Sequence, residues 1–233
     1  IRAAQESRGL GDVYKRQVGN YGVGHVRYPT AGGAGKEFAQ PMYVNSPYGI
    51  SLAHNGNLTN SESLANELFH AEMRHLNTDS DSEVLLNIFA HELGKQREIY
   101  PEAKHIFKAF KKTHRRCDGA YAVIGLITGF GLVAFRDPNG IRPLIIGIRK
   151  GKTRDEYMIA SENSAFTSLG FKTLRDIEPG EAIFIDNNGT LFTQQCAETY
   201  QQRPCIFEYV YFSRPDSTLD QISVYKSRMR MGK

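Results

Sequence analysis

Three polar segments near the start of the chain contain residue types that could do chemistry together. They are "GHVRYPTAGG" at 24–33, "AHNGN" at 53–57 and "SDSE" at 80–83. The guanidinium of Arg27 is planar and suits bidentate binding of a carboxylate. A surface ion pair is an equally good interpretation of this arginine, so its role depends on the groups around it.

Asn55 and Gly56 suggest a second function. A side-chain N–H of the asparagine and the backbone N–H of the glycine can both donate to one developing oxyanion, although the same dipeptide also suits a simple turn. Asp81 falls in the first turn of a predicted helix, where the helix dipole favours a carboxylate even without a ligand. An arginine for a carboxylate, an aspartate for an ammonium group and an oxyanion pair between them fit a free α-amino acid whose side-chain carbonyl is attacked. Glutamine is such a substrate.

The composition argues against several classes of protein. The chain has 233 residues, 40% of them hydrophobic and 23% charged, which predicts one globular domain with the edge of a second. No apolar run approaches the roughly 20 residues of a membrane helix, so we expect a cytoplasmic protein without a membrane partner. The 29 Lys and Arg are spread along the chain, and the clusters at 111–116 and 226–233 read as solvated faces rather than a nucleic-acid surface.

The cysteines and histidines indicate neither a disulfide framework nor a metal site. Cys117, Cys196 and Cys205 are an odd number without a C-x-x-C spacing, which is typical of reduced thiols in a cytoplasm. The seven histidines include no H-E-x-x-H motif. We therefore expect no metal in this chain.

The elements that must position these residues are strands and helices in a mixed order. Short apolar runs at 21–28 and 48–54 predict strands that end in polar loops, the second of them at Asn55 and Gly56. A Thr59-x-x-Glu62 capping box predicts a helix that begins there.

A second helix is predicted to follow a Ser80-x-x-Glu83 capping box. The residues predicted to form its buried stripe are Val84, Leu85, Ile88, Phe89 and Leu93. Gly94 is predicted to end the helix. A third helix is expected from Pro101 to about Thr113.

Hairpin signals dominate the rest of the chain. Two apolar segments in 119–140 are joined by Thr-Gly-Phe-Gly, and apolar runs at 156–161 and 181–193 repeat the pattern with an Asn-Gly turn. Hairpins give antiparallel strands, and the helices are concentrated in the first half. The pattern predicts an α+β protein with sheets covered by helices, not a doubly wound parallel sheet.

The chain closely resembles the amidophosphoribosyltransferase family, also called glutamine phosphoribosylpyrophosphate amidotransferases, from residue 17 to residue 233. The motifs are "GHVRYPTAG", "PYGISLAHNGNLTN", "TDSDSEVLLNIFAHEL", "GAYAVIGLI", "AFRDPNGIRPL", "PGEAIFI" and "CIFEYVYFSRPDS". The first three motifs occur in looser form in other glutaminases with an N-terminal nucleophile, including glucosamine-6-phosphate synthase. The motifs "RDPNGIRPL" and "CIFEYVYFSRPDS" narrow the resemblance to the amidophosphoribosyltransferases. The resemblance implies a four-layer αββα sandwich of the N-terminal-nucleophile hydrolase type.

The resemblance also implies roles for individual residues. It assigns Arg27 and Thr30 to glutamine binding, Asn55 and Gly56 to the oxyanion hole, and Asp81 to the α-ammonium group. In the family an N-terminal cysteine thiol attacks the carboxamide of glutamine, and its own α-amino group serves as base.

The released ammonia has a second substrate in the family. It displaces pyrophosphate from phosphoribosyl pyrophosphate in a separate transferase domain, which gives phosphoribosylamine in the first committed step of purine synthesis. The resemblance further implies Mg²⁺ for that transferase domain, no cofactor for residues 1–233, and a homo-oligomer for the full-length enzyme.

The chain departs from the family pattern at both ends. Residues 1–16 do not match and are expected to be non-native, 17–203 are expected to form the glutaminase domain, and 204–233 a linker and the start of the transferase domain. We expect an N-terminally truncated chain that lacks the nucleophilic cysteine and is itself inactive. Cys205 occupies a position that ligates an iron–sulfur cluster in some relatives, but the residues beside it resemble the cluster-free branch. The alternative is a non-catalytic, glutaminase-like binding or regulatory domain.

Overall fold

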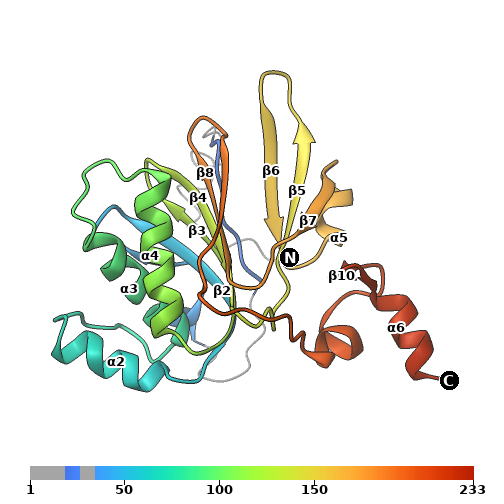
Figure 1. The fold of residues 1–233 in the computed structure, drawn as a ribbon, viewed down its shortest axis with the longest axis horizontal. Helices are drawn as coiled ribbons and strands as arrows, with labels where there is room; N and C mark the ends of the chain where they lie inside the picture. Colours follow the sequence, from blue (N-terminus) through green and yellow to red (C-terminus); the bar gives the residue numbers. More distant parts are fainter. Residues whose placement is uncertain (1–18, 27–34) are drawn as a thin grey trace.

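The computed structural model describes residues 19–26 and 35–233, and it arranges them in four layers. From left to right in Figure 1 these layers are a group of helices, a six-stranded sheet, a three-stranded sheet and a second group of helices. All strand pairs in the described part of the chain are antiparallel. The architecture is therefore α+β, as the sequence pattern predicts, and has the αββα layers that the resemblance implies.

The strands form two main sheets and one short ribbon. The six-stranded sheet contains, in spatial order, β1 (Met42–Val44), β2 (Ile50–Leu58), β3 (Gly119–Ile127), β4 (Gly131–Arg136), β8 (Glu181–Asp186) and β9 (Leu191–Gln195). The three-stranded sheet contains β6 (Asp155–Ala160), β5 (Ile145–Lys150) and β7 (Lys172–Asp176). The ribbon consists of β10 (Thr218–Leu219) and β11 (Ile222–Ser223).

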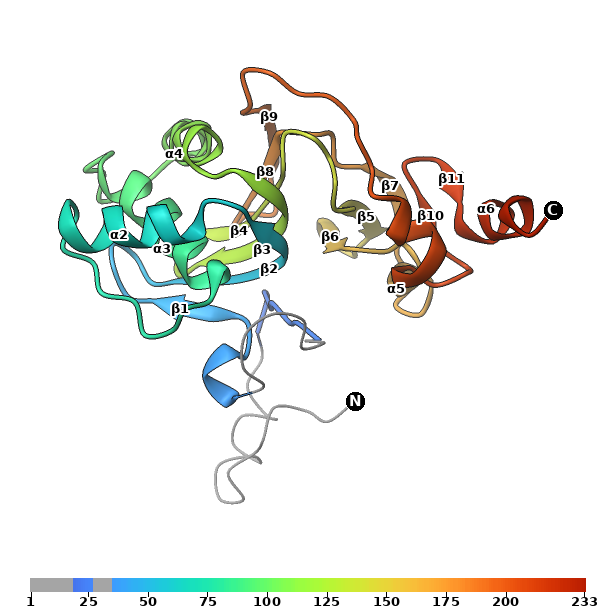
Figure 2. The same ribbon diagram turned by 90° about the horizontal axis from the view of Figure 1, so that it is seen from below.

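The helices lie on the two outer faces, as both views show (Figures 1 and 2). The first group contains α2 (Ser61–His70), α3 (Asp81–Gly94) and α4 (Ala103–Arg116). The second contains α5 (Ser164–Thr167), the π-helical turn η2 (Glu208–Phe212) and α6 (Val224–Met231), and a short 3₁₀ turn, η1 (Lys36–Phe38), precedes β1. Within the described residues, no helix combines the length and the apolar character that a membrane crossing requires.

Alternating side chains of the strands build three separate apolar layers. On β4, Val133 and Phe135 face the first helix group, whereas Ala134 faces the three-stranded sheet. On β5, Ile146 faces the six-stranded sheet and Ile145 faces the second helix group. A shift of one residue in register would exchange the two faces of a strand, so this alternation fixes the pairing.

All three predicted helices are present, but their caps and ends differ from the prediction. Helix α3 begins after Ser80, whose side chain caps the N–H of Ser82, and it ends at Gly94. The stripe predicted for this helix is buried, but so is nearly every other residue of it, because α3 lies between the sheet and the neighbouring helices. Glu83 does not complete the expected capping box, since its carboxylate accepts from Asn77 and Thr78 instead.

The other two helices differ at their ends. The cap of α2 is Asn60 rather than Thr59, it makes no side-chain capping bond, and the helix stops at His70. Helix α4 runs to Arg116, a turn further than expected, and Glu102 and His105 form a reciprocal capping box at its start.

The hairpins are confirmed, whereas two strand predictions are wrong. β3 pairs with β4 and β8 pairs with β9, the latter through a turn in which Gly189 has a φ of +81°. Residues 21–26 form no strand. β2 does not end at Asn55 and Gly56 but runs on to Leu58, because β3 is long enough to pair with the whole of it.

Residues after 203 pack on the three-stranded sheet rather than trailing away from it. Tyr209, Leu219 and Val224 share a buried cluster with Ile145. Arg136, whose side chain is only 1% exposed, forms a bidentate ion pair with Asp220. The domain boundary at residue 203 stays a prediction.

Candidate functional site

The candidate site lies where β2 runs beside the start of α3. Asn55 and Gly56 belong to β2, and Asp81 is the first residue of α3. The Leu58 N–H donates to Oδ2 of Asp81 at 2.9 Å, which holds the helix start against the strand. The structure thus brings three of the five predicted site residues together, while Arg27 and Thr30 lie outside the described residues.

The pairing of β2 decides where the Gly56 N–H points. Residues directly opposite each other in an antiparallel pair alternate between hydrogen-bonded and non-hydrogen-bonded pairs. The Thr59 N–H donates to Asp118 and the Thr128 N–H donates to Gly49, so the odd-numbered residues of β2 are the ones that exchange hydrogen bonds with β3. Gly56, opposite Tyr121, is an even-numbered residue, and its N–H therefore points away from β3.

The neighbouring even-numbered N–H groups on that edge have side-chain acceptors. The His54 N–H donates to Oε1 of Gln40 at 2.6 Å, and the Leu58 N–H donates to Asp81. β1 pairs with β2 only up to Leu52, so it does not reach Gly56. No described side chain accepts from the Gly56 N–H, which leaves one exposed donor between two occupied ones.

Glycine is required at position 56 by its backbone and its surroundings. Its φ is +147°, a region that side chains rarely adopt. A Cβ atom would lie 1.9 Å from the Ala120 carbonyl oxygen and 2.9 Å from Nε2 of His54. Gly56 as a whole is an exposed residue.

The Asn55 carboxamide is held at both ends. Its Oδ1 lies 2.8 Å from Nε2 of His25, and its Nδ2 donates to Oγ of Ser161 at 2.9 Å. One of the two Nδ2 hydrogens is used in this way, and the second is available to a ligand. The side chain is neither fully buried nor fully exposed.

His54 is a buried residue that lies beside Ser82 and Asp81. Its side chain is 1% exposed, and Nδ1 lies 3.1 Å from Oγ of Ser82 and 4.0 Å from Oδ1 of Asp81. Burial lowers the pKa of His54, and the nearby Asp81 carboxylate only partly offsets this effect. The imidazole is therefore neutral at pH 7, and the negative charge of Asp81 is not cancelled by it.

Sequence reasoning missed His25, His54 and Ser161. The two histidines stand inside the polar segments that were singled out, at positions directly before Val26 and Asn55, so their proximity was visible. Ser161 lies 106 residues from Asn55 and gave no signal, because only the packing of the two sheets brings them together.

The buried thiols are poorly suited to nucleophilic attack. Cys117 and Cys196 are each 3% exposed. Burial raises the pKa of each thiol to about 12, so both stay protonated at neutral pH. Cys205 is partly exposed.

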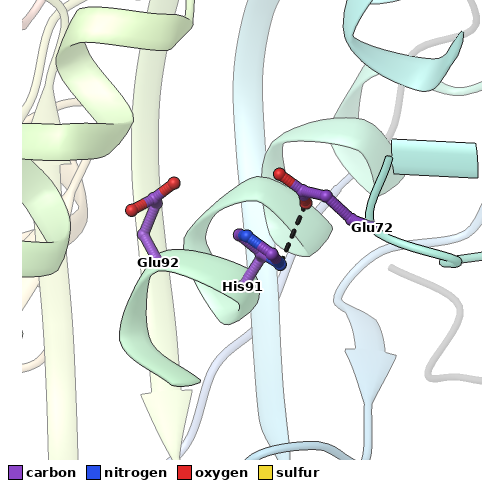
Figure 3. A group of neighbouring side chains, drawn as sticks. All are labelled: Glu72, His91 and Glu92. Carbon is purple, nitrogen blue, oxygen red and sulfur yellow. Dashed lines mark ion pairs between the residues drawn. The ribbon is translucent and has the colours of Figure 1, made fainter. Parts of the chain in front are cut away.

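A second cluster of titratable groups lies between the helices of the first group. Figure 3 shows Glu72, which follows α2, beside His91 and Glu92 of α3. Nδ1 of His91 lies 3.0 Å from Oε2 of Glu72. One histidine nitrogen and two carboxylate oxygens at this separation are a possible metal-ligand set.

Basic side chains already neutralise this cluster. Arg116 contacts Oε1 of Glu92 at 2.7 Å and Oε1 of Glu72 at 2.9 Å, and Lys95 contacts Glu92 at 3.1 Å. Burial would raise the pKa of Glu92, but the hydrogen bonds from Lys95 and Arg116 outweigh it and lower that pKa. A divalent cation would have to displace the guanidinium, so we interpret the cluster as an ion-pair network that joins α2, α3 and α4.

Comparisons with known proteins identify the family of the chain. The chain is 58% identical over 219 residues to the amidophosphoribosyltransferase of Escherichia coli, which covers 94% of this chain and 43% of the relative. The corresponding enzyme of Pseudomonas aeruginosa is 57% identical over 218 residues, or 94% of this chain and 44% of the relative. The chain thus spans less than half the length of these relatives.

Solved structures and a family model complete the comparison. The glutamine phosphoribosylpyrophosphate amidotransferase from B. subtilis, complexed with ADP and GMP, superposes with a TM-score of 0.73 at 33% identity, over 89% of this chain and 42% of that one. A structure described as the allosteric regulatory enzyme of purine biosynthesis gives a TM-score of 0.74 at 35% identity, with the same coverage. Residues 34–168 match the model of the glutamine amidotransferase domain. The chain belongs to the glutamine amidotransferase domain family.

Proposed function

We propose that this chain is the glutamine-hydrolysing part of an amidophosphoribosyltransferase. Support comes from its identity of 57–58% to two bacterial amidophosphoribosyltransferases over 94% of the chain. The substrate of this part is L-glutamine, and its products are glutamate and ammonia.

The observation that carries the proposal is the Gly56 N–H, which has no side-chain acceptor among the described residues. It is exposed on the edge of β2, beside the carboxamide of Asn55 and next to the aspartate that accepts from Leu58. Two neutral donors therefore lie on adjacent residues, and the Asp81 carboxylate is held at Leu58, two residues further along β2. A glutamine side-chain carbonyl can accept from both donors while its α-ammonium group pairs with Asp81.

The reaction follows from this placement. A thiolate attacks the side-chain carbonyl carbon of glutamine, and the electron pair of the carbonyl bond moves to the oxygen. Asn55 and Gly56 donate to this oxyanion, which stabilises the tetrahedral intermediate more than the neutral substrate. The base, which the resemblance identifies as the α-amino group of the nucleophile, passes the proton of the thiol to the amide nitrogen. When the carbonyl re-forms, this nitrogen leaves as ammonia, and water then hydrolyses the thioester to glutamate and restores the thiol. The resemblance assigns the thiolate to an N-terminal cysteine, and the high pKa of Cys117 and Cys196 supports a nucleophile other than these two.

The other half of the reaction belongs to the longer relatives. We propose that the ammonia displaces pyrophosphate from phosphoribosyl pyrophosphate in a transferase domain, that Mg²⁺ assists there, and that the complete enzyme is a cytoplasmic homo-oligomer. Arg27 completes the glutamine site by binding the α-carboxylate, and Thr30 is a further glutamine-binding residue beside it in the sequence. The steps of glutamine hydrolysis described above need no metal.

A chimera tests the proposal. The matching 219 residues of the E. coli relative are replaced by those of this chain, and formation of phosphoribosylamine is measured with glutamine and, separately, with ammonia. We expect activity with both nitrogen sources. A chimera that uses ammonia but neither hydrolyses nor binds glutamine would contradict the proposal and favour a non-catalytic domain.

A further inference from the structure

The Asn55 carboxamide is clamped between two groups that come from different parts of the fold. His25 belongs to the described segment 19–26, and Ser161 directly follows β6 in the three-stranded sheet. Asn55 itself lies in the six-stranded sheet. The contact with Ser161 therefore crosses the boundary between the two sheets, at a polar edge of the apolar layer that joins them.

The three groups are matched as donors and acceptors along one line of contacts. A carbonyl oxygen only accepts, so the contact of 2.8 Å between Oδ1 of Asn55 and Nε2 of His25 requires a hydrogen on that nitrogen. The hydroxyl of Ser161 accepts from Nδ2 at 2.9 Å. With both contacts made, the NH₂ end cannot exchange places with the oxygen without reversing the donors and acceptors on both sides.

Ser161 is held in place by its own neighbours. Glu162 accepts from the backbone N–H of Arg214 at 2.8 Å and from the hydroxyl of Ser217, and Asn163 accepts from the N–H of Thr218 at 2.9 Å. These bonds fasten the turn after β6 to the segment that leads into β10. A serine on such a turn can act as a fixed reference point rather than as a mobile surface hydroxyl.

We propose that Ser161 and His25 are positioning residues that keep the N–H of the Asn55 carboxamide aimed at the oxyanion. The inference rests on the proposed function, because it assumes that Asn55 donates to the transition state. Neither residue needs to touch glutamine. Ser161 and His25 should affect the rate of the chemical step. A misdirected carboxamide would lose its hydrogen bond to the oxyanion, and this bond is strongest in the transition state.

The test uses the chimera with the E. coli relative. Ser161→Ala should lower the glutamine-dependent kcat about tenfold, leave KM for glutamine within about twofold, and leave the ammonia-dependent rate unchanged. Ser161→Thr, which keeps the hydroxyl, should recover most of the rate. Ser168→Ala, at an exposed serine that ends α5, is the matched control and should behave as the parent.

A double-mutant cycle separates this inference from the proposed function. In the Asn55→Ala background, Ser161→Ala should have no further effect, because its partner is gone. If Asn55→Ala slows glutamine use but Ser161→Ala costs the same factor with and without Asn55, the positioning role is wrong and the proposed function stands. If Asn55→Ala itself has no selective effect on glutamine use, the proposed function fails first.

A second readout does not depend on activity. In the ¹⁵N-labelled chain, the Asn55 side-chain NH₂ signal is identified by its loss in Asn55→Ala. It should shift in both Ser161→Ala and His25→Ala and stay in place in Ser168→Ala. An unchanged signal in both variants would show that the two contacts do not hold the carboxamide, and would overturn the inference.

Discussion

The β2–α3 site and the Glu72–His91–Glu92 cluster both gather polar groups, but they differ in how those groups are satisfied. In the cluster, Arg116 contacts both glutamates at 2.7–2.9 Å. At the site, the Gly56 N–H and one hydrogen of Asn55 have no described acceptor, and the charge of Asp81 faces a neutral histidine. A search for charged groups alone would select the cluster, whereas a search for donors without a described acceptor selects the β2–α3 site.

This difference reflects two uses of a polar group. An ion-pair network that closes on itself links secondary-structure elements and offers a ligand nothing. Donors that are held in place but left without a partner cost free energy in the empty protein and become useful when a ligand accepts from them. Substitutions in the β2–α3 site should therefore change activity. Substitutions in the Glu72–His91–Glu92 cluster should change stability.

Gly56→Ala should have the largest effect, because it strikes both the site and the sheet. The new methyl group would meet the Ala120 carbonyl oxygen at 1.9 Å in a backbone conformation with φ of +147°. Strain and overpacking together predict a loss of roughly 4–6 kcal/mol in the free energy of unfolding, measured by urea denaturation. Gly129→Ala is the control, since Gly129 also has a positive φ but no atom within 4 Å of its Cβ position. Equal losses in the two variants would show that backbone conformation, not the contact with Ala120, decides the cost.

Arg116→Gln should destabilise the chain without touching the site. It removes the guanidinium from the carboxylates of Glu72 and Glu92, which are only 8% and 6% exposed. Lys95 then remains as the cationic partner of Glu92 alone. We expect a loss of roughly 2–4 kcal/mol, which corresponds to about 10 °C in Tm for a chain of this size.

The matched control for this variant is Arg115→Gln. Arg115 and its partner Glu198 are 50% and 67% exposed, so the loss should be below about 1 kcal/mol. Similar Tm values for the two variants would mean that the network contributes no more than a surface ion pair.

His91 should make the stability of the chain depend on pH. We expect this effect to be smaller than the loss of stability in Arg116→Gln. Burial lowers the pKa of His91 from 6.5 to about 4. Because the folded state holds the imidazole neutral, this contribution to stability is complete above pH 6.5 and is lost as the pH falls towards 4. Burial also raises the pKa of Glu72, so its titration could add to that of His91. The comparison is therefore between the parent chain and His91→Gln. The difference in Tm between these two proteins should change between pH 7 and pH 5 in favour of the variant, and a constant difference would contradict the assignment.

Much of the fold was predictable because its signals are local. The hairpin turns at 128–131 and 188–189 and the cap at Ser80 identify strands and a helix from neighbouring residues. The end of β2 was predicted wrongly, since Asn55 and Gly56 read as a turn. Only the long partner strand β3 keeps these two residues in the sheet.

The site was predictable in its residue types but not in its support. Asn55, Gly56 and Asp81 stood out because they lie in short polar motifs and because the sequence resembles a family in which they have roles. The direction of the Gly56 N–H depends on the parity of strand pairing, and the clamp on Asn55 depends on Ser161 from another sheet. Both are consequences of tertiary structure that no local pattern encodes.

The central claim is that Asn55 and Gly56 form an oxyanion hole for glutamine, and Asn55→Ala in the E. coli chimera tests it most directly. Loss of one donor of this kind costs about 2.7–4 kcal/mol in the barrier, so glutamine-dependent turnover should fall roughly 100- to 1000-fold. Glutamine binding should change little, and the rate with ammonia should be preserved, because ammonia bypasses the thioester. An equal fall in the glutamine-dependent and ammonia-dependent rates would contradict the account and would show that Asn55 supports the fold rather than the chemistry.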